Sequence, residues 1–79
     1  MDNQKKLFQV FADVLKVDIA SLDEKSSPDT IPNWDSLAVV NLVSELEQTF
    51  SVQFDILEIV DFHNIEVIKS ILMEKGIVF

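Results

Sequence analysis

The chain has 79 residues, of which 48% are apolar, and it contains no cysteine. This length predicts one small domain over residues 1–79, in which folding buries only about 60% of the surface of the unfolded chain. The lack of cysteine excludes disulfides, thiolate metal sites and a thiol nucleophile. No apolar run approaches about 18 residues, so no membrane span is expected. The first residues lead into an amphipathic segment and not into a signal peptide, which predicts a cytoplasmic location.

The net charge of −8 is concentrated in the middle of the sequence. No Lys or Arg occurs between Lys25 and Lys69, and that stretch contains eight acidic residues: Asp29, Asp35, Glu45, Glu47, Asp55, Glu58, Asp61 and Glu66. A negative field of this kind repels nucleic acid and anionic membranes and attracts basic protein partners. The sequence therefore predicts no nucleic-acid or membrane partner. The alternative is an acidic surface that only aids solubility.

The first predicted element is an amphipathic helix over residues 3–16. Its apolar residues recur at three- and four-residue spacing, which defines one core face: Leu7, Phe8, Phe11, Val14 and Leu15. A long loop over residues 17–34 follows and is rich in the turn formers Ser, Pro, Asp and Asn. Loops of this length are often functional. Four apolar residues are expected to anchor it to the core: Ile19, Leu22, Ile31 and Trp34.

A second helix is predicted from Ser36 to about Phe50, with Asp35 as its N-cap, because a short carboxylate accepts free N–H groups of the first turn. Helical geometry assigns five residues to its core face: Val39, Leu42, Val43, Leu46 and Phe50. Leu37 falls among polar residues instead, and Val40 lies on the flank nearest Ser36. An apolar residue on a wet face indicates contact with a partner. The alternative is that Leu37 folds back onto the long loop.

Residues 54–59 read as the start of a short third helix. Asp55 is placed to cap it, and Glu58 stands three residues later, as in a capping box. Phe54 and Ile59 have the spacing of a hydrophobic staple. The alternating apolar residues also fit a strand, but a single strand would have no partner in this chain.

Asn64 is predicted to cap a fourth helix that ends near Lys75 and Gly76. Its inner face is formed by Ile65, Ile68, Ile71 and Leu72. The expected fold is therefore all-α, a four-helix bundle with a long loop between the first two helices and a short third helix.

Ser36 occupies the first position of the second helix, near the positive end of the helix dipole. A phosphate ester there would meet unpaired N–H groups and a favourable field. The alternative is that Ser36 only helps to cap the helix.

Other chemistry finds little support in the sequence. His63 is the only histidine, and one His supplies neither a metal site nor a proton relay. No Gly-rich phosphate loop is present. An EF-hand requires Gly at the sixth position of its loop, where loops starting at Asp23 or Asp29 have Pro28 or Trp34. We therefore expect neither a metal site nor a self-sufficient enzyme.

The sequence resembles the acyl carrier protein family. Trp34-Asp35-Ser36-Leu37 is similar to that family's attachment motif, whose core is Asp-Ser-Leu, and the likeness extends through the run at residues 42–50. The resemblance implies a single acyl carrier domain over residues 1–79 with the four-helix fold of the family. It also implies that a phosphopantetheinyl transferase esterifies Ser36 with 4′-phosphopantetheine from coenzyme A. Acyl groups would then be carried as thioesters, while catalysis would belong to the partner enzymes.

The resemblance further implies a monomer that is recognised by acyl-loading and acyl-processing enzymes. The expected recognition residues are Asp35, Leu37, Val40, Glu45 and Glu47. Family members that serve fatty-acid synthesis usually have acids early in the second helix, where this chain has Ala38 and Asn41. This departure favours a dedicated carrier in a polyketide, polysaccharide, lipid-modifying or aminoacyl pathway. The competing hypothesis is a helical interaction module without a prosthetic group, although such a module would be free to lose the serine.

Overall fold

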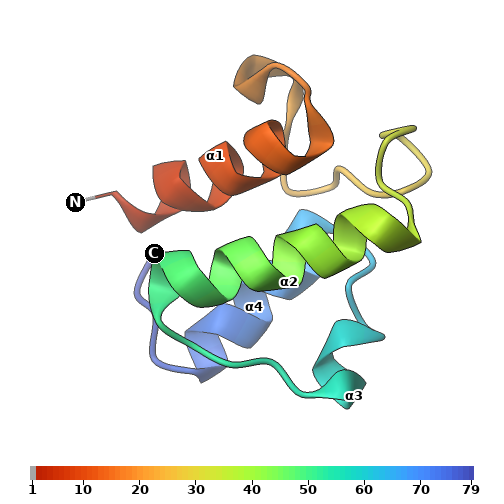
Figure 1. The fold of residues 1–79 in the computed structure, drawn as a ribbon. Helices are drawn as coiled ribbons and strands as arrows, with labels where there is room; N and C mark the ends of the chain where they lie inside the picture. Colours follow the sequence, from red (N-terminus) through yellow and green to blue (C-terminus); the bar gives the residue numbers. More distant parts are fainter. Residues whose placement is uncertain (1) are drawn as a thin grey trace.

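The structure of the chain is a computed structural model that describes residues 2–79; Met1 lies outside the described residues. It contains four α-helices and one 3₁₀-helix, η1, and residues 2–79 contain no strand. The elements are α1 (Asn3–Leu15), η1 (Ile19–Ser21), α2 (Ser36–Phe50), α3 (Ile56–Ile59) and α4 (Ile65–Glu74) (Figure 1). The predicted all-α fold, with a long loop after α1 and a short third helix, is confirmed.

α1 and α2 lie side by side and run in opposite directions, and α4 lies behind α2 in Figure 1. Between them is one core whose largest fully buried side chains come from these three helices: Leu7, Phe11, Leu15, Leu42, Leu46, Ile65, Ile68 and Leu72. The predicted core faces are thus largely confirmed. Phe8, Val14, Val39 and Val43 are only half-buried and pack against the edge of this core.

The ends of α1 follow from its capping groups. The Asp2 carboxylate accepts a hydrogen bond from the N–H of Lys5 at 3.2 Å, which satisfies a first-turn donor. Lys16 adopts a left-handed conformation with φ 58°, and its N–H donates to the carbonyl oxygen of Ala12. α1 therefore ends at Leu15, one residue before the predicted boundary.

The loop between α1 and α2 is anchored at its end more than at its start. Ile31 and Trp34 are buried, and the Trp34 ring packs against Phe11 with 5.4 Å between ring centroids. Leu22 packs partly against the core. The expectation for Ile19 is wrong: it opens η1, none of whose residues is buried, and it lies outside the core cluster.

The same loop also caps the start of α4. The N–H of Ile65 donates to the carbonyl oxygen of Ser26 at 3.2 Å, and the N–H of Glu66 donates to that of Glu24 at 2.9 Å. The Lys69 ammonium lies 3.0 Å from a Glu24 carboxylate oxygen. Backbone donors that a helix start leaves unpaired are thus satisfied by a distant segment.

α3 begins at Ile56 and shows the predicted capping box. The Asp55 carboxylate accepts from the N–H of Glu58 at 2.9 Å, and the Glu58 carboxylate accepts from the N–H of Asp55 at 3.0 Å. α4 begins after its Asn64 cap as predicted, and Gly76 has φ 97° just beyond its end. A left-handed backbone of this kind favours glycine after a helix.

Candidate functional site

α2 begins at Ser36, whose side chain is exposed at the first position of this 15-residue helix. One Asp35 carboxylate oxygen accepts the N–H of Ala38 at 2.9 Å, and the Asp35 carbonyl accepts the N–H of Val39 at 3.0 Å. Within residues 2–79, the N–H groups of Ser36 and Leu37 donate no hydrogen bond. Two donors at the positive end of the helix dipole are therefore open beside the serine hydroxyl.

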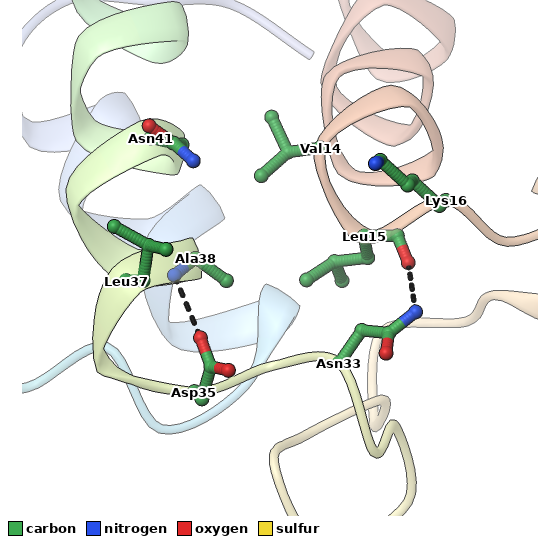
Figure 2. A pocket seen from close by; sticks show the side chains of 8 residues that line it. All are labelled: Val14, Leu15, Lys16, Asn33, Asp35, Leu37, Ala38 and Asn41. Atoms are coloured by element: carbon green, nitrogen blue, oxygen red, sulfur yellow. Dashed lines mark hydrogen bonds between the residues drawn. The ribbon is translucent and has the colours of Figure 1, made fainter.

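The start of α2 is held in place by the residues just before it. The side-chain amide of Asn33 donates to the carbonyl oxygen of Leu15 at 2.8 Å, which ties the loop to the last turn of α1 (Figure 2). Trp34 is only 3% exposed, and its backbone N–H donates to the carbonyl oxygen of Ile31 at 3.0 Å. The serine thus follows a short segment that is fixed to the core on one side and to α1 on the other.

Leu37 and Val40 have the exposure expected from helical periodicity. Leu37 is 70% exposed and Val40 is 64% exposed, although both are apolar. The alternative in which Leu37 folds back onto the long loop does not agree with this exposure. Ala38, between them, is buried and joins the core, which places it on the opposite side of the helix.

The two predicted recognition glutamates differ in their surroundings. Glu45 is exposed. Glu47 is half-buried, and its carboxylate accepts the N–H of Phe54 at 2.9 Å, so it holds the segment between α2 and α3. The sequence did not indicate this structural role of Glu47, because Glu47 and Phe54 are seven residues apart and the end of α2 lies between them.

Sequence reasoning also missed the apolar surface of α3. Ile56, Leu57 and Val60 are all exposed, and α3 lies at the end of the molecule where α2 begins (Figure 1). Within residues 2–79, five of the seven exposed large hydrophobic side chains belong to α3, its C-cap and the first turns of α2. The signal that could have revealed this surface is length: a four-residue helix has too few positions to bury all of its apolar residues.

Two lysines form ion pairs with acidic side chains outside α2. The Lys75 ammonium lies 2.8 Å from a Glu58 carboxylate oxygen, and this hydrogen bond, together with the N–H of Asp55, holds the pKa of Glu58 below its ordinary value. The hydrogen bond and charge of Lys69 lower the pKa of Glu24 in the same way. The acids of α2 and Asp35 have no such ion pair within residues 2–79.

A cavity of about 250 Å³ lies between the end of α1 and the start of α2. Figure 2 shows the side chains of Val14, Lys16 and Asn41 directed toward one another across it. The cavity also adjoins both neighbours of the serine, because Asp35 and Leu37 contribute to its lining.

The donor set at the start of α2 fits a phosphate ester better than a metal ion. An exposed hydroxyl with two open backbone N–H groups suits an anion, since such groups bind phosphate oxygens at helix N-termini. Residues 2–79 contain no group of three or more His, Cys, Asp or Glu side chains arranged to hold a metal. No helix among them has both the length and the apolar character that a membrane crossing requires.

Comparison with known proteins agrees with this chemistry. The family described as phosphopantetheine attachment site matches residues 34–72, from Trp34 in the loop to Leu72 in α4. No curated protein matches the chain at a significant level. Domains of the matching family hold covalently attached 4′-phosphopantetheine and act as non-catalytic carriers. The motif, the helical fold and this match over residues 34–72 are consistent with a member of the acyl carrier protein family.

Proposed function

We propose that Ser36 is the residue to which 4′-phosphopantetheine is attached and that the protein carries acyl groups for partner enzymes. The observation that supports this most strongly is the exposed Ser36 hydroxyl at the first position of α2, inside the matched region. When attached, the group supplies a terminal thiol for the acyl group, which this cysteine-free chain lacks.

The residues around Ser36 have distinct tasks in this proposal. Asp35 caps α2 through Ala38, so that the N–H groups of Ser36 and Leu37 remain open for phosphate oxygens. The helix dipole adds a favourable field for negative charge at that end. Trp34, buried against Phe11, keeps the serine at a constant position for incoming enzymes.

The partners in this proposal are a phosphopantetheinyl transferase and acyl-loading and acyl-processing enzymes, which meet the protein as a monomer in the cytoplasm. Leu37 and Val40 would form the apolar contact, and Asp35 and Glu45 the charged one. Glu47 would contribute charge while it holds the N–H of Phe54. Since Ala38 is buried and Asn41 is neutral, this face has fewer acids than is usual for fatty-acid synthesis, which supports a dedicated pathway.

The proposal is tested by incubating the protein with coenzyme A and a broad-specificity phosphopantetheinyl transferase, followed by intact-mass measurement. We expect one added phosphopantetheinyl unit on the wild type and on Ser44→Ala, a control at another exposed serine of α2. Ser36→Ala should stay unmodified yet folded, with its free energy of unfolding within about 1 kcal/mol of the wild type, because Asp35 still caps the helix.

Two results would contradict the proposal. A wild-type chain that stays unmodified would favour the interaction module without a prosthetic group. Modification that persists in Ser36→Ala would show that attachment occurs at another residue.

A further inference from the structure

A lysine at the end of α1 lies beside Ser36. Lys16 lines the cavity of about 250 Å³ between α1 and α2, together with Asp35 and Leu37, the two neighbours of the serine. Figure 2 shows the Lys16 side chain directed from the end of α1 toward α2. No other lysine of residues 2–79 contributes to this lining. A primary amine is therefore close to the proposed attachment residue.

The backbone keeps Lys16 near Ser36. Lys16 follows α1 in a left-handed conformation with φ 58°, and its N–H donates to the carbonyl oxygen of Ala12. The carbonyl oxygen of Leu15 accepts from the side chain of Asn33 at 2.8 Å, in the segment that leads into α2. The end of α1 and the start of α2 are thus tied together. The Lys16 amine can move only as far from the serine as its own side chain allows.

Lys16 also differs from other lysines of the chain in its surroundings. Lys69 and Lys75 are held by glutamates, with ammonium–carboxylate distances of 3.0 and 2.8 Å. Within residues 2–79, Lys16 makes no ion pair. Lys6 makes none either, but it lies roughly 15 Å from Lys16 along the axis of α1, toward the end of the helix that is farther from the serine.

We propose that Lys16 is an acyl acceptor, to which an acyl group carried as a thioester on Ser36 is transferred when no partner enzyme removes it. The inference rests on attachment at Ser36. In this step the neutral amine attacks the thioester carbonyl, a C–N bond forms and the C–S bond breaks. The leaving thiolate takes up the proton that the nitrogen releases. The products are an amide on Lys16 and the free thiol of the arm, and no further reactant is needed.

Tethering makes Lys16 the preferred acceptor. A short flexible linker gives an effective concentration in the millimolar range, about a hundredfold above a protein sample at about 10 μM. An arm that starts beside Lys16 must extend along most of α1 to reach Lys6, so fewer of its conformations bring the thioester there. Acylation would also remove the positive charge of Lys16 from the cavity that Asp35 lines. The acidic field around the serine would then become stronger.

The test loads a butyryl group onto the full chain with a broad-specificity phosphopantetheinyl transferase and butyryl-coenzyme A. Intact mass shows whether loading has occurred, and the free coenzyme is then removed. The loaded protein is incubated at about pH 9, where more of a lysine side chain is neutral than at pH 7. Hydroxylamine next cleaves thioesters but not amides, and peptide mapping locates the butyryl groups that remain. We expect at least about tenfold more of them on Lys16 than on Lys6.

Two variants and one mixed sample serve as controls. Lys16→Arg keeps the positive charge but removes the amine, and it should lose the hydroxylamine-resistant butyryl group. Lys6→Arg makes the same change on the same helix and should retain it. A ¹⁵N-labelled Ser36→Ala chain, mixed into the sample of loaded wild type, reports transfer between molecules. Its Lys16 should be acylated about a hundredfold less than that of the loaded chain.

The outcomes separate this inference from the proposed function. A wild type that cannot be loaded would contradict attachment at Ser36, and the inference would fall with it. A loaded chain without a hydroxylamine-resistant butyryl group would overturn the inference alone. The same holds if Lys6 carries as much of the group as Lys16, or if the ¹⁵N-labelled chain is acylated as fast as the loaded one.

Discussion

Replacing Leu37 by Ala separates a recognition role from a structural one, and Leu42 on the same helix is the matched control. Leu37 is 70% exposed, whereas Leu42 is 0% exposed. Fully burying a leucine is worth about 1.5–3 kcal/mol, so the smaller buried part of Leu37 accounts for under about 1 kcal/mol. Leu42→Ala should cost about 2–5 kcal/mol, because it also leaves a cavity. The free energy of unfolding of a domain of this size is roughly 4–12 kcal/mol, so only the loss caused by Leu42→Ala is severe.

The measurement is thermal unfolding of both unmodified variants, followed by their rates of modification by the transferase. A loss of 1 kcal/mol lowers Tm by about 4–8 °C in a domain of this size, so Leu37→Ala should stay within that range of the wild type. It should nevertheless be modified slowly. If Leu37→Ala were as unstable as Leu42→Ala, Leu37 would be a core residue. If it were modified at the wild-type rate, Leu37 would not contact the transferase.

Three further predictions concern charge, steering and the anchor of the loop. Lys75 lowers the pKa of Glu58 from its ordinary value of 4.5. The ion pair between them therefore stabilises the folded protein above about pH 4.5, and this stabilisation is lost as the pH falls through the lowered pKa. Lys75→Met should therefore lower Tm at pH 7 and change it less at pH 3, and an equal change at both would contradict this. Glu45→Lys should slow association with a basic partner, and the effect should be larger at low salt than at about 0.15 M ionic strength. Glu47 is left unchanged because it holds the segment between α2 and α3. Stopped-flow association rates equal to those of the wild type would show that Glu45 does not steer the partner. Asn33→Ala should lower the free energy of unfolding in urea by about 0.5–1.5 kcal/mol and slow modification, and an unchanged urea midpoint would show that this hydrogen bond does not stabilise the loop.

The helices and their caps could be predicted because their determinants are local. α2 begins at Ser36, as predicted, since Asp35 supplies the cap and Pro32 opposes an earlier helical start. The capping box of Asp55 and Glu58 likewise depends on residues three apart. Helical periodicity placed Leu37 among polar residues but left open whether it folds back onto the long loop, and its 70% exposure decides against that alternative.

The features that were missed depend on contacts between distant segments. The carboxylate of Glu47 finds its donor at Phe54, across a helix end. Glu24 and Ser26 accept from the first turn of α4, a pairing that no local pattern indicates. Ile19 is apolar, as a residue that anchors the loop to the core would be, but the path of the chain through η1 leaves it outside the core. The cavity between the end of α1 and the start of α2 likewise depends on how these two helices lie against each other.

The order of burial around Ser36 explains how a small domain can present a reactive position without losing stability. Trp34 and Ala38 are both buried, and the three residues between them, Asp35, Ser36 and Leu37, are exposed. The exposed motif is therefore held at both ends by core side chains, and its backbone has little freedom to move. Since the cap on Ala38 belongs to Asp35, the residue next to Ser36 also fixes the first turn of the helix. A partner enzyme can then meet the serine in one geometry, which lowers the entropy that docking must remove.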